Sequence, residues 1–294
     1  MCLLAIAIDT SARWPLVIAS NRDEYRDRPT LPLAVWTTSN DNTLLSGRDL
    51  RAGGTWMGST PSGRIALLTN VREPDAAPAA LSRGELPLRW LEGQMNTADF
   101  LAATDAEFYG GCNLVIGDVL NGDWAWASNR VKLKGGAAPL NSGLMASGWQ
   151  SMELRPGIYG LSNALLDTPW PKTLALKTAM QEALNVAETD ADESALTRIL
   201  WLALANRQPA NVNDLPATGV MPWLERALSS ALIDMPERSH GGYGTLASTL
   251  MWIEKQAVTG ALNATICEKT IKADAQSAGS SDAQMVRLTW PLRG

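Results

Sequence analysis

The feature that most constrains the fold of this chain is a set of short apolar runs that lack the alternation of a half-buried strand. Cys2–Ile8 and residues 16–20 are almost entirely apolar, and residues 9–11 between them supply the chemistry of a turn. Residues 54–59 and 64–69 repeat this arrangement around a second turn. Runs of this kind are typical of strands that are covered on both faces. The first half of the sequence therefore predicts buried strands.

The middle of the chain has helical patterns. Residues 172–184 follow a proline that suits the first turn of a helix. Residues 193–206 carry apolar side chains at helical spacing. Shorter helices are predicted over residues 85–93 and over residues 97–104, the second of which is preceded by the good capping residue Asn96.

The C-terminal part returns to strand patterns, over residues 245–254, 260–269 and 284–291. Between the last two, the small and polar residues 273–282 predict a loop. Strands on both sides of a helical middle predict an α+β architecture in which packed sheets carry helices on the outside. We expect one domain over residues 1–294.

Charge and hydropathy exclude several classes of protein. The chain has 25 Lys and Arg residues against 30 Asp and Glu residues, a net charge of −5, which disfavours binding to nucleic acid. No run approaches the roughly 18–20 apolar residues that a membrane span needs. The opening MCLLAIAID lacks the basic leader and long apolar run of a secretory signal. We therefore expect a cytoplasmic protein with no membrane span.

Three cysteines and a single histidine limit the chemistry. Cys2, Cys112 and Cys267 are widely spaced, so the sequence predicts no disulfide framework and no metal site. A catalytic site that needs histidine would have to recruit His240, which stands in a turn-like segment and is interpreted as a loop residue.

Three apolar runs end in a hydroxyl residue followed by asparagine, at Ser20-Asn21, Thr69-Asn70 and Ser162-Asn163. Asparagine is a common strand terminator because it tolerates turn conformations. Alternatively, the three strand ends gather around one polar site, where neutral amides would stabilise a developing oxyanion without titrating. In that interpretation Asn21 is a substrate-binding candidate.

Cys2 becomes the first residue if Met1 is removed, which we expect because the second side chain is small. The new α-amino group would have a pKa of about 7.7–8.0 and the thiol a pKa of about 8.5. The amine could then accept the thiol proton near neutral pH, without a histidine. Arg22, if close, would lower the thiol pKa, and Asp23 could hold the ammonium. The alternative is that Cys2 is a small buried hydrophobic residue at the start of a strand.

Residues 21–24, Asn-Arg-Asp-Glu, belong to a series of motifs that covers most of the chain. The others are residues 1–2 (MC), 46–49 (SGRD), 53–58 (GGTWMG), 63–70 (GRIALLTN), 82–86 (SRGEL), 113–118 (NLVIGD) and 159–172 (YGLSNALLDTPWPK). On these motifs the chain resembles the NRDE family, also called the transport-and-Golgi-organisation-2 family.

This family is similar to N-terminal-nucleophile (Ntn) cysteine hydrolases of the bile-salt hydrolase and penicillin V acylase type. The resemblance implies a four-layer αββα fold and a reaction on a small acyl amide or thioester. It implies that Cys2 is the nucleophile, and that a backbone N–H of Asn70 and the side-chain amide of Asn163 stabilise the oxyanion.

The sequence departs from the acylase pattern at two places. The acylases space their Arg and Asp three residues apart, whereas Arg22 and Asp23 are adjacent. Leu246 stands where an arginine is expected. Another residue must supply the charge and the fork of hydrogen-bond donors that this arginine would have provided, or acylase chemistry is absent.

The resemblance also implies an alternative role in intracellular trafficking of haem, lipid or acyl-CoA, without turnover. The chain has 12 tryptophans against 2 phenylalanines, and Trp56 and Trp170 fall within the family motifs as candidates to line a ligand pocket. The alternative is that they are ordinary core and edge residues. No cofactor is required for the hydrolase reading. If haem is the ligand, Cys2, His240, a methionine or a tyrosine are the candidates to bind its iron.

Overall fold

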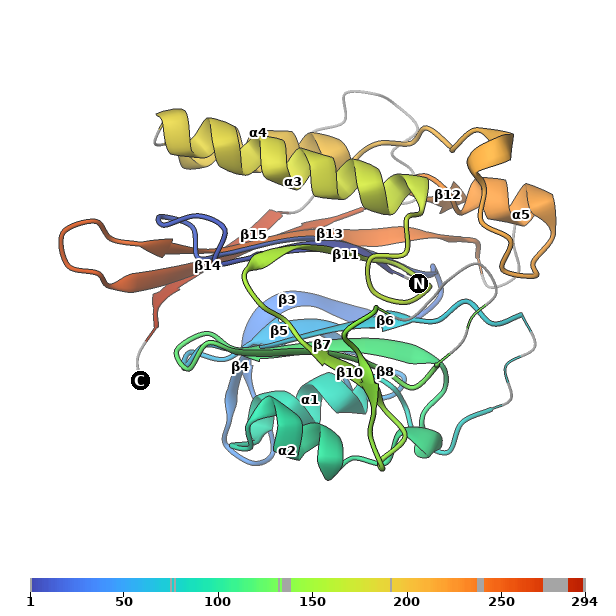
Figure 1. Cartoon of the computed structure of the whole chain (residues 1–294), viewed down its shortest axis with the longest axis horizontal. Coiled ribbons are helices and arrows are strands. Elements are labelled where there is room, and N and C mark those ends of the chain that lie inside the picture. The colour runs from blue at the N-terminus through green and yellow to red at the C-terminus, as the bar shows by residue number, and fades with distance from the viewer. Residues whose placement is uncertain are drawn as a thin grey trace.

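The computed structural model describes residues 2–74, 76, 78–131, 133, 139–190, 192–236, 241–271 and 285–292. Met1, His240 and the predicted loop at residues 273–282 lie outside these residues. The described residues form four layers, with two β-sheets stacked face to face and helices on both outer sides (Figure 1). This confirms the predicted α+β class and its αββα layering.

The first sheet carries the N-terminal strand in its interior, and each of its strands is antiparallel to its neighbours. Their order is β11 (Gly157–Leu161), β1 (Cys2–Ile8), β2 (Leu16–Tyr25), β13 (Tyr243–Lys255), β14 (Leu262–Thr270) and β15 (Met285–Pro291), and β12 (Asp234–Met235) also pairs with β13. β1 is buried on both faces. Leu4 and Ile6 pack between the sheets, while Leu3 and Ala5 pack toward the helices. This explains the unbroken apolar run in the sequence.

The second sheet is also antiparallel throughout. Its order is β3 (Thr30–Thr37), β4 (Thr43–Asp49), β5 (Met57–Ser59), β6 (Arg64–Asn70), β7 (Cys112–Asp118), β8 (Asp123–Ser128), β10 (Gln150–Glu153) and β9 (Gly143–Leu144). Its outer face packs on α1 (Glu85–Glu92) and α2 (Thr97–Ala102), where Trp90 and Phe100 are buried. Short 3₁₀ helices occupy Ala106–Phe108 and Val212–Asp214.

The helices begin where the sequence indicates. The Asn96 side chain accepts a hydrogen bond from Asp99 N at 2.8 Å and caps α2. α3 (Pro171–Asp190) starts at its proline and continues past the predicted end at residue 184. With α4 (Glu193–Leu204) it covers the first sheet, and α5 (Pro222–Ala227) lies near the end of the sheet where β1 begins (Figure 1).

Two strand predictions need correction. β2 does not end at residue 20 but continues to Tyr25, because β13 pairs with it as far as Tyr243 opposite Tyr25. Asn21 is therefore inside a strand, whereas Asn70 does end β6 and Asn163 does follow β11. The sequence also gives no prediction for β3 and β4. β3 is an edge strand with mostly exposed or partly exposed side chains, so it lacks an apolar pattern.

Candidate active site

Cys2 lies at the start of β1, opposite Arg22 of β2, and only 8% of it is exposed. Beside it is a pocket, here called the inner pocket, with an empty volume of about 550 Å³ that includes the part open to solvent. Its lining includes Cys2, Arg22 and Asp23 from the first sheet and Leu68 and Asn70 from the second. The inner pocket is thus built where the ends of the two sheets meet.

Hydrogen bonds tie the three chain segments at this end together. The Ser162 hydroxyl donates to Cys2 O at 3.0 Å. Asn163 Nδ2 donates to Asn70 O at 2.9 Å. Arg72 N donates to Asn163 O at 2.8 Å. Cys2, Asn70 and Asn163 are therefore gathered in one place, although the Asn163 amide donates to the Asn70 carbonyl and is not among the groups that line the inner pocket.

Asn21, the proposed substrate-binding asparagine, does not line the inner pocket. Successive side chains of a strand point to opposite faces, so Asn21 faces the helices while Arg22 faces the other sheet. Asn21 Nδ2 donates to Leu204 O at 2.9 Å and to Ala231 O at 2.8 Å, and its oxygen accepts from the Ser248 hydroxyl at 2.6 Å. Asn21 is fully buried and joins the sheet to the end of α4.

An arginine guanidinium stacks on the ring of each of the two candidate tryptophans, Trp56 and Trp170. The Arg22 guanidinium lies 4.1 Å from the centre of the Trp56 ring, and both residues line the inner pocket. The Arg72 guanidinium lies 4.7 Å from the centre of the Trp170 ring. Trp170 is buried and is not among the residues that line the inner pocket. The geometry therefore places Trp56, but not Trp170, in the pocket wall.

Asp23 is held on the other side of β2 from Arg22. Its Oδ1 accepts a hydrogen bond from the Thr245 hydroxyl at 2.7 Å, and only 1% of the residue is exposed. Burial raises the pKa of the Asp23 carboxyl, while the positive charge of Lys172 opposes this most strongly among the described residues. Asp23 is therefore a buried carboxyl whose ionisation depends on nearby cations.

Leu246, the residue found where an arginine is expected, lies at a β-bulge. The pairing of β13 with β2 shifts between Thr245, which is opposite Asp23, and Ala247, which is opposite Arg22. The bulge inserts Leu246 beside the two charged residues without contributing a charge. Any further cation at this site must come from a different element.

Burial raises the pKa of the Cys2 thiol above its ordinary value, and the charge of Asp23 acts in the same direction. The positive charge of Arg22 and a hydrogen bond from the Asp23 main-chain N–H lower it, but by less. Arg22 thus acts in the predicted direction, but burial outweighs it. In the chain that retains Met1, the thiol is held protonated near neutral pH.

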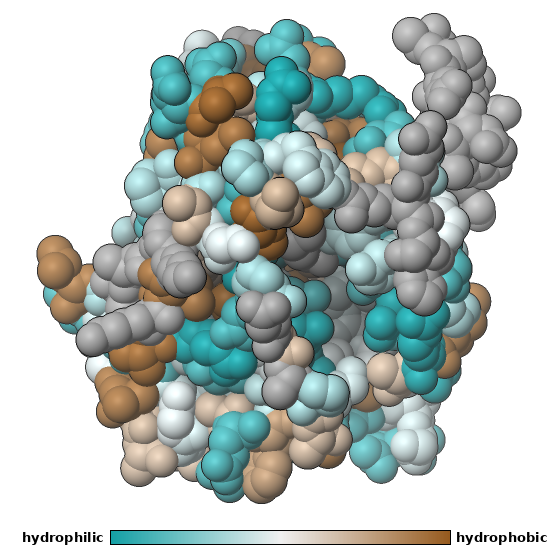
Figure 2. All heavy atoms as spheres, turned by 90° about the vertical axis from the view of Figure 1, so that its right-hand side faces the viewer, coloured by the Kyte–Doolittle hydropathy of each residue, from teal (hydrophilic) through white to brown (hydrophobic). Residues whose placement is uncertain are grey.

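A second and larger depression, here called the outer cleft, adjoins the inner pocket and shares Asn70, Ser82 and Arg83 with it. Its empty volume is about 1540 Å³, including open solvent. Apolar side chains such as Val71 and Leu224 line it beside the cation Arg72. α5 and the start of β1 are at the right of Figure 1, the side that faces the viewer in Figure 2, where hydrophilic and hydrophobic residues are intermixed.

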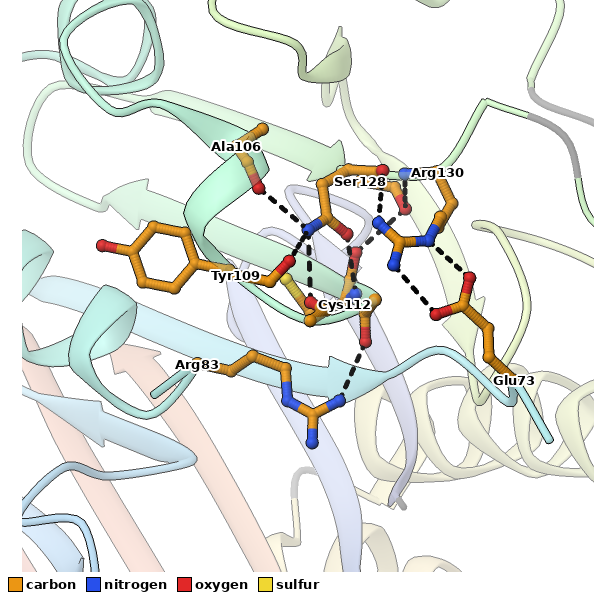
Figure 3. A network of polar contacts seen from close by, with 10 residues as sticks. Glu73, Arg83, Ala106, Tyr109, Cys112, Ser128 and Arg130 are labelled. Carbon is orange, nitrogen blue, oxygen red and sulfur yellow. Dashed lines mark hydrogen bonds and ion pairs between the residues drawn. The ribbon is translucent and has the colours of Figure 1, made fainter. Parts of the chain in front are cut away.

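The wall between β6 and α1 is anchored by the network in Figure 3. Arg130 binds Glu73 through Nε and Nη2, the latter at 2.9 Å from Oε2. Arg83 Nη1 donates to Gly111 O at 3.1 Å. These contacts fasten Glu73 to the segment that follows β8 and Arg83 to the segment that leads into β7, so the residues shared by the two depressions have a fixed support.

A family model for transport and Golgi organisation 2 matches residues 1–273. The chain belongs to this family. A bovine transport and Golgi organization protein 2 homolog is 31% identical over 271 residues, which cover 86% of this chain and 89% of that protein. The human homolog is 30% identical over 269 residues, again covering 86% and 89%. The family resemblance inferred from the motifs is thereby confirmed.

Solved structures of similar layering come from Ntn hydrolases at very low identity. An N-acylethanolamine-hydrolyzing acid amidase ortholog of Caenorhabditis elegans has a TM-score of 0.47 at 10% identity, covering 85% of this chain and 92% of that one. A mutant of conjugated bile acid hydrolase from Clostridium perfringens has a TM-score of 0.42 at 8% identity, covering 98% and 92%.

In this member of the transport and Golgi organisation 2 family, two cations near the site were missed by the sequence analysis. Lys172, at the start of α3, is 5% exposed and its Nζ donates to Leu228 O at 3.0 Å. Burial lowers the pKa of Lys172 to about 8, against an opposing contribution from Asp23. Arg72 forms a buried ion pair with Glu225 at 2.5 Å. Both cations fall inside or beside family motifs, which was the signal available.

The described residues fit haem poorly at the inner pocket. Cys2 is the axial-ligand candidate that lines it, and burial favours its protonated thiol, whereas iron binds the thiolate. The described part of the chain contains no group of three or more His, Cys, Asp or Glu side chains arranged to hold a metal ion. None of its helices has the length and apolarity needed to cross a membrane.

Proposed function

We propose that the mature chain begins at Cys2 and that this cysteine is the N-terminal nucleophile of a hydrolase or acyltransferase for a small acyl amide or thioester. The observation that carries the proposal is that Cys2 and Asn70 line the same pocket. Removal of Met1 would place a primary amine on Cys2 itself, next to its thiol. Arg22 and Asp23 supply charges of opposite sign on the neighbouring strand.

The chemistry follows from these groups. The α-amine of Cys2 accepts the thiol proton, and the sulfur attacks the carbonyl carbon of the substrate. The oxyanion that forms receives a hydrogen bond from the main-chain N–H of Asn70, whose carbonyl Asn163 holds in place. The amine then returns the proton to the leaving nitrogen or sulfur, and an acyl-cysteine remains. Water or another acceptor attacks that thioester and releases the acid or the new ester or amide.

A second candidate function is a carrier for a lipid or acyl-CoA ligand that does not turn over. The apolar lining of the outer cleft favours it, and so does the lack of a charge at Leu246. Haem belongs to the same candidate function through the family resemblance, although the inner pocket suits it poorly. In a carrier, Cys2 would be a buried residue whose raised pKa has no catalytic consequence.

Mass spectrometry of the intact protein, followed by acylation of the thiol, tests the two candidates. We expect loss of Met1, and formation of a covalent acyl adduct on Cys2 when p-nitrophenyl acetate or an acyl thioester is added. Cys112→Ser is the matched control, because burial raises the pKa of Cys112 to about 12 and leaves it unreactive. A retained methionine, or an adduct that survives Cys2→Ala, would rule out the nucleophile. Haem titration of the same preparations identifies a haem carrier by a Soret shift.

A further inference from the structure

Arg72 uses only part of its hydrogen-bonding capacity. Its Nη1 donates to Glu225 Oε2 at 2.5 Å, and the side chains of the two residues are 5% and 4% exposed. Its Nε and Nη2 are buried, and neither has a hydrogen-bond partner among the residues that the structure describes. A buried guanidinium edge without an acceptor is costly, because both N–H groups have lost water.

Other arginines of this protein show what that edge binds. Arg13 Nε and Nη2 donate to Glu254 Oε1 at 3.0 and 2.7 Å. Arg28 Nε and Nη2 donate to Asp49 Oδ2 at 3.0 and 2.5 Å. Arg130 binds Glu73 with the same two atoms. The Nε–Nη2 edge presents two nearly parallel N–H groups that match the geometry of a carboxylate or phosphate.

Arg72 lies close to the candidate active site. Arg72 lines the outer cleft, two residues after Asn70, which lines both depressions. Its backbone is tied to Asn163, and the ring of Trp170 supports the guanidinium. A second buried donor, the hydroxyl of Tyr243, also lacks a described partner. Burial raises the pKa of this hydroxyl, and the positive charge of Arg72 opposes that rise.

We propose that the Nε–Nη2 edge of Arg72 binds the carboxylate or phosphate group of an amphipathic ligand in the outer cleft. The apolar part of this ligand contacts Val71, Leu81 and Leu224, which line the same cleft. Where the proposed function holds, on which this use of the site rests, the ligand's reactive carbonyl lies toward Cys2. The substrate class is then an acyl compound that carries an oxyanion group.

Calorimetric titration of the full-length protein with octanoate, with neutral octanol and with inorganic phosphate tests the proposal. We expect octanoate to bind Arg72→Lys at least tenfold more weakly than wild type, which is about 1.4 kcal/mol, because lysine keeps the charge but loses the fork. Octanol should bind both within twofold. Arg89→Leu, which removes a half-exposed arginine of α1, is the matched control and should leave octanoate binding unchanged.

A single substitution of Arg72 by a neutral residue would leave the buried carboxylate of Glu225 without its partner and could weaken folding. A double variant avoids this because no buried charge is left unpaired. Arg72→Leu/Glu225→Leu removes both members of the ion pair and should show the same selective loss of octanoate. If phosphate alone shows this dependence on Arg72, the oxyanion is a phosphate and the proposal stands. Equal affinity of octanoate and octanol for wild type, or anion binding that Arg72 variants leave unchanged, overturns it.

Cys2→Ala separates this proposal from the proposed function. Binding of octanoate or phosphate that depends on Arg72 and persists in Cys2→Ala supports the anion site whether or not the thiol is acylated. Failure of acylation on Cys2 with intact anion binding would reject the nucleophile alone. Acylation of Cys2 without any anion binding would reject the Arg72 site alone.

Discussion

Asn163 donates a hydrogen bond from Nδ2 to the main-chain oxygen of Asn70 at 2.9 Å. The bond joins the segment after β11, in the first sheet, to the end of β6, in the second. It therefore couples the two halves of the sandwich at the point where Cys2 begins β1.

We expect Asn163→Ala to reduce the free energy of unfolding by about 1–2 kcal/mol, because the Asn70 carbonyl loses its donor in a partly buried setting. Urea unfolding followed by tryptophan fluorescence measures the loss. The control is Asn185→Ala, which changes an exposed asparagine of α3. A loss no greater than in the control would show that the bond contributes nothing to coupling the sheets.

The lowered pKa of Lys172 predicts that the protein becomes more stable as the pH rises above about 8. Burial lowers its folded-state pKa to about 8 from 10.5, so between these values the unfolded chain binds the extra proton. Stability therefore rises with pH across this window, by about 3 kcal/mol at most. Lys172→Met should lack this rise. The measurement is the difference in unfolding free energy between wild type and variant at pH 7.5 and pH 10.

Other groups also titrate in that range, so a surface lysine of the same helix serves as the reference. Lys177→Met removes a partly exposed lysine that pairs with Asp167. Its stability should follow wild type at both pH values. Parallel curves for wild type and Lys172→Met would contradict a depressed pKa for Lys172.

Arg22 should control the reactivity of Cys2. Its charge lowers the thiol pKa, so Arg22→Leu is expected to slow alkylation of Cys2 by iodoacetamide at pH 7.5 by about tenfold, because a smaller fraction of the thiol is then ionised. The alkylation rate of Arg22→Lys should lie between those of wild type and Arg22→Leu. Peptide mass spectrometry assigns the modified cysteine. Arg48→Leu, which removes an arginine stacked on Trp36, is the control. Equal rates for wild type and Arg22→Leu would remove Arg22 from the activation of the thiol.

Asn21 should matter for stability and not for the thiol. Asn21→Ala removes two donated bonds and one accepted bond, and leaves the carbonyls of Leu204 and Ala231 without that donor. We expect a loss of about 1–3 kcal/mol in unfolding free energy. The alkylation rate of Cys2 should stay within twofold of wild type. A large change in the alkylation rate with unchanged stability would contradict this and would support the first interpretation of Asn21 as a substrate-binding residue.

Much of the fold could be predicted from local patterns. The apolar run at β1, the cap at Asn96 and the proline at the start of α3 each act over a few residues, and each predicted element is present. The edge strand β3 could not be predicted in this way, because its side chains are largely exposed and carry no apolar signal. The end of β2 was missed because it depends on pairing with a strand far along the chain, β13.

The sequence by itself determined the family, the layered class and the presence of Cys2, Asn70 and Asn163 at strand ends. Only the tertiary structure decided which of these side chains share a pocket. It turned Asn21 to the helices and Arg22 to the pocket, and it buried Cys2 enough to raise its pKa. It also joined Arg72 to Glu225 across 153 positions of the chain. Strand position and side-chain alternation are local properties, whereas burial and charge pairing depend on which distant segments pack together.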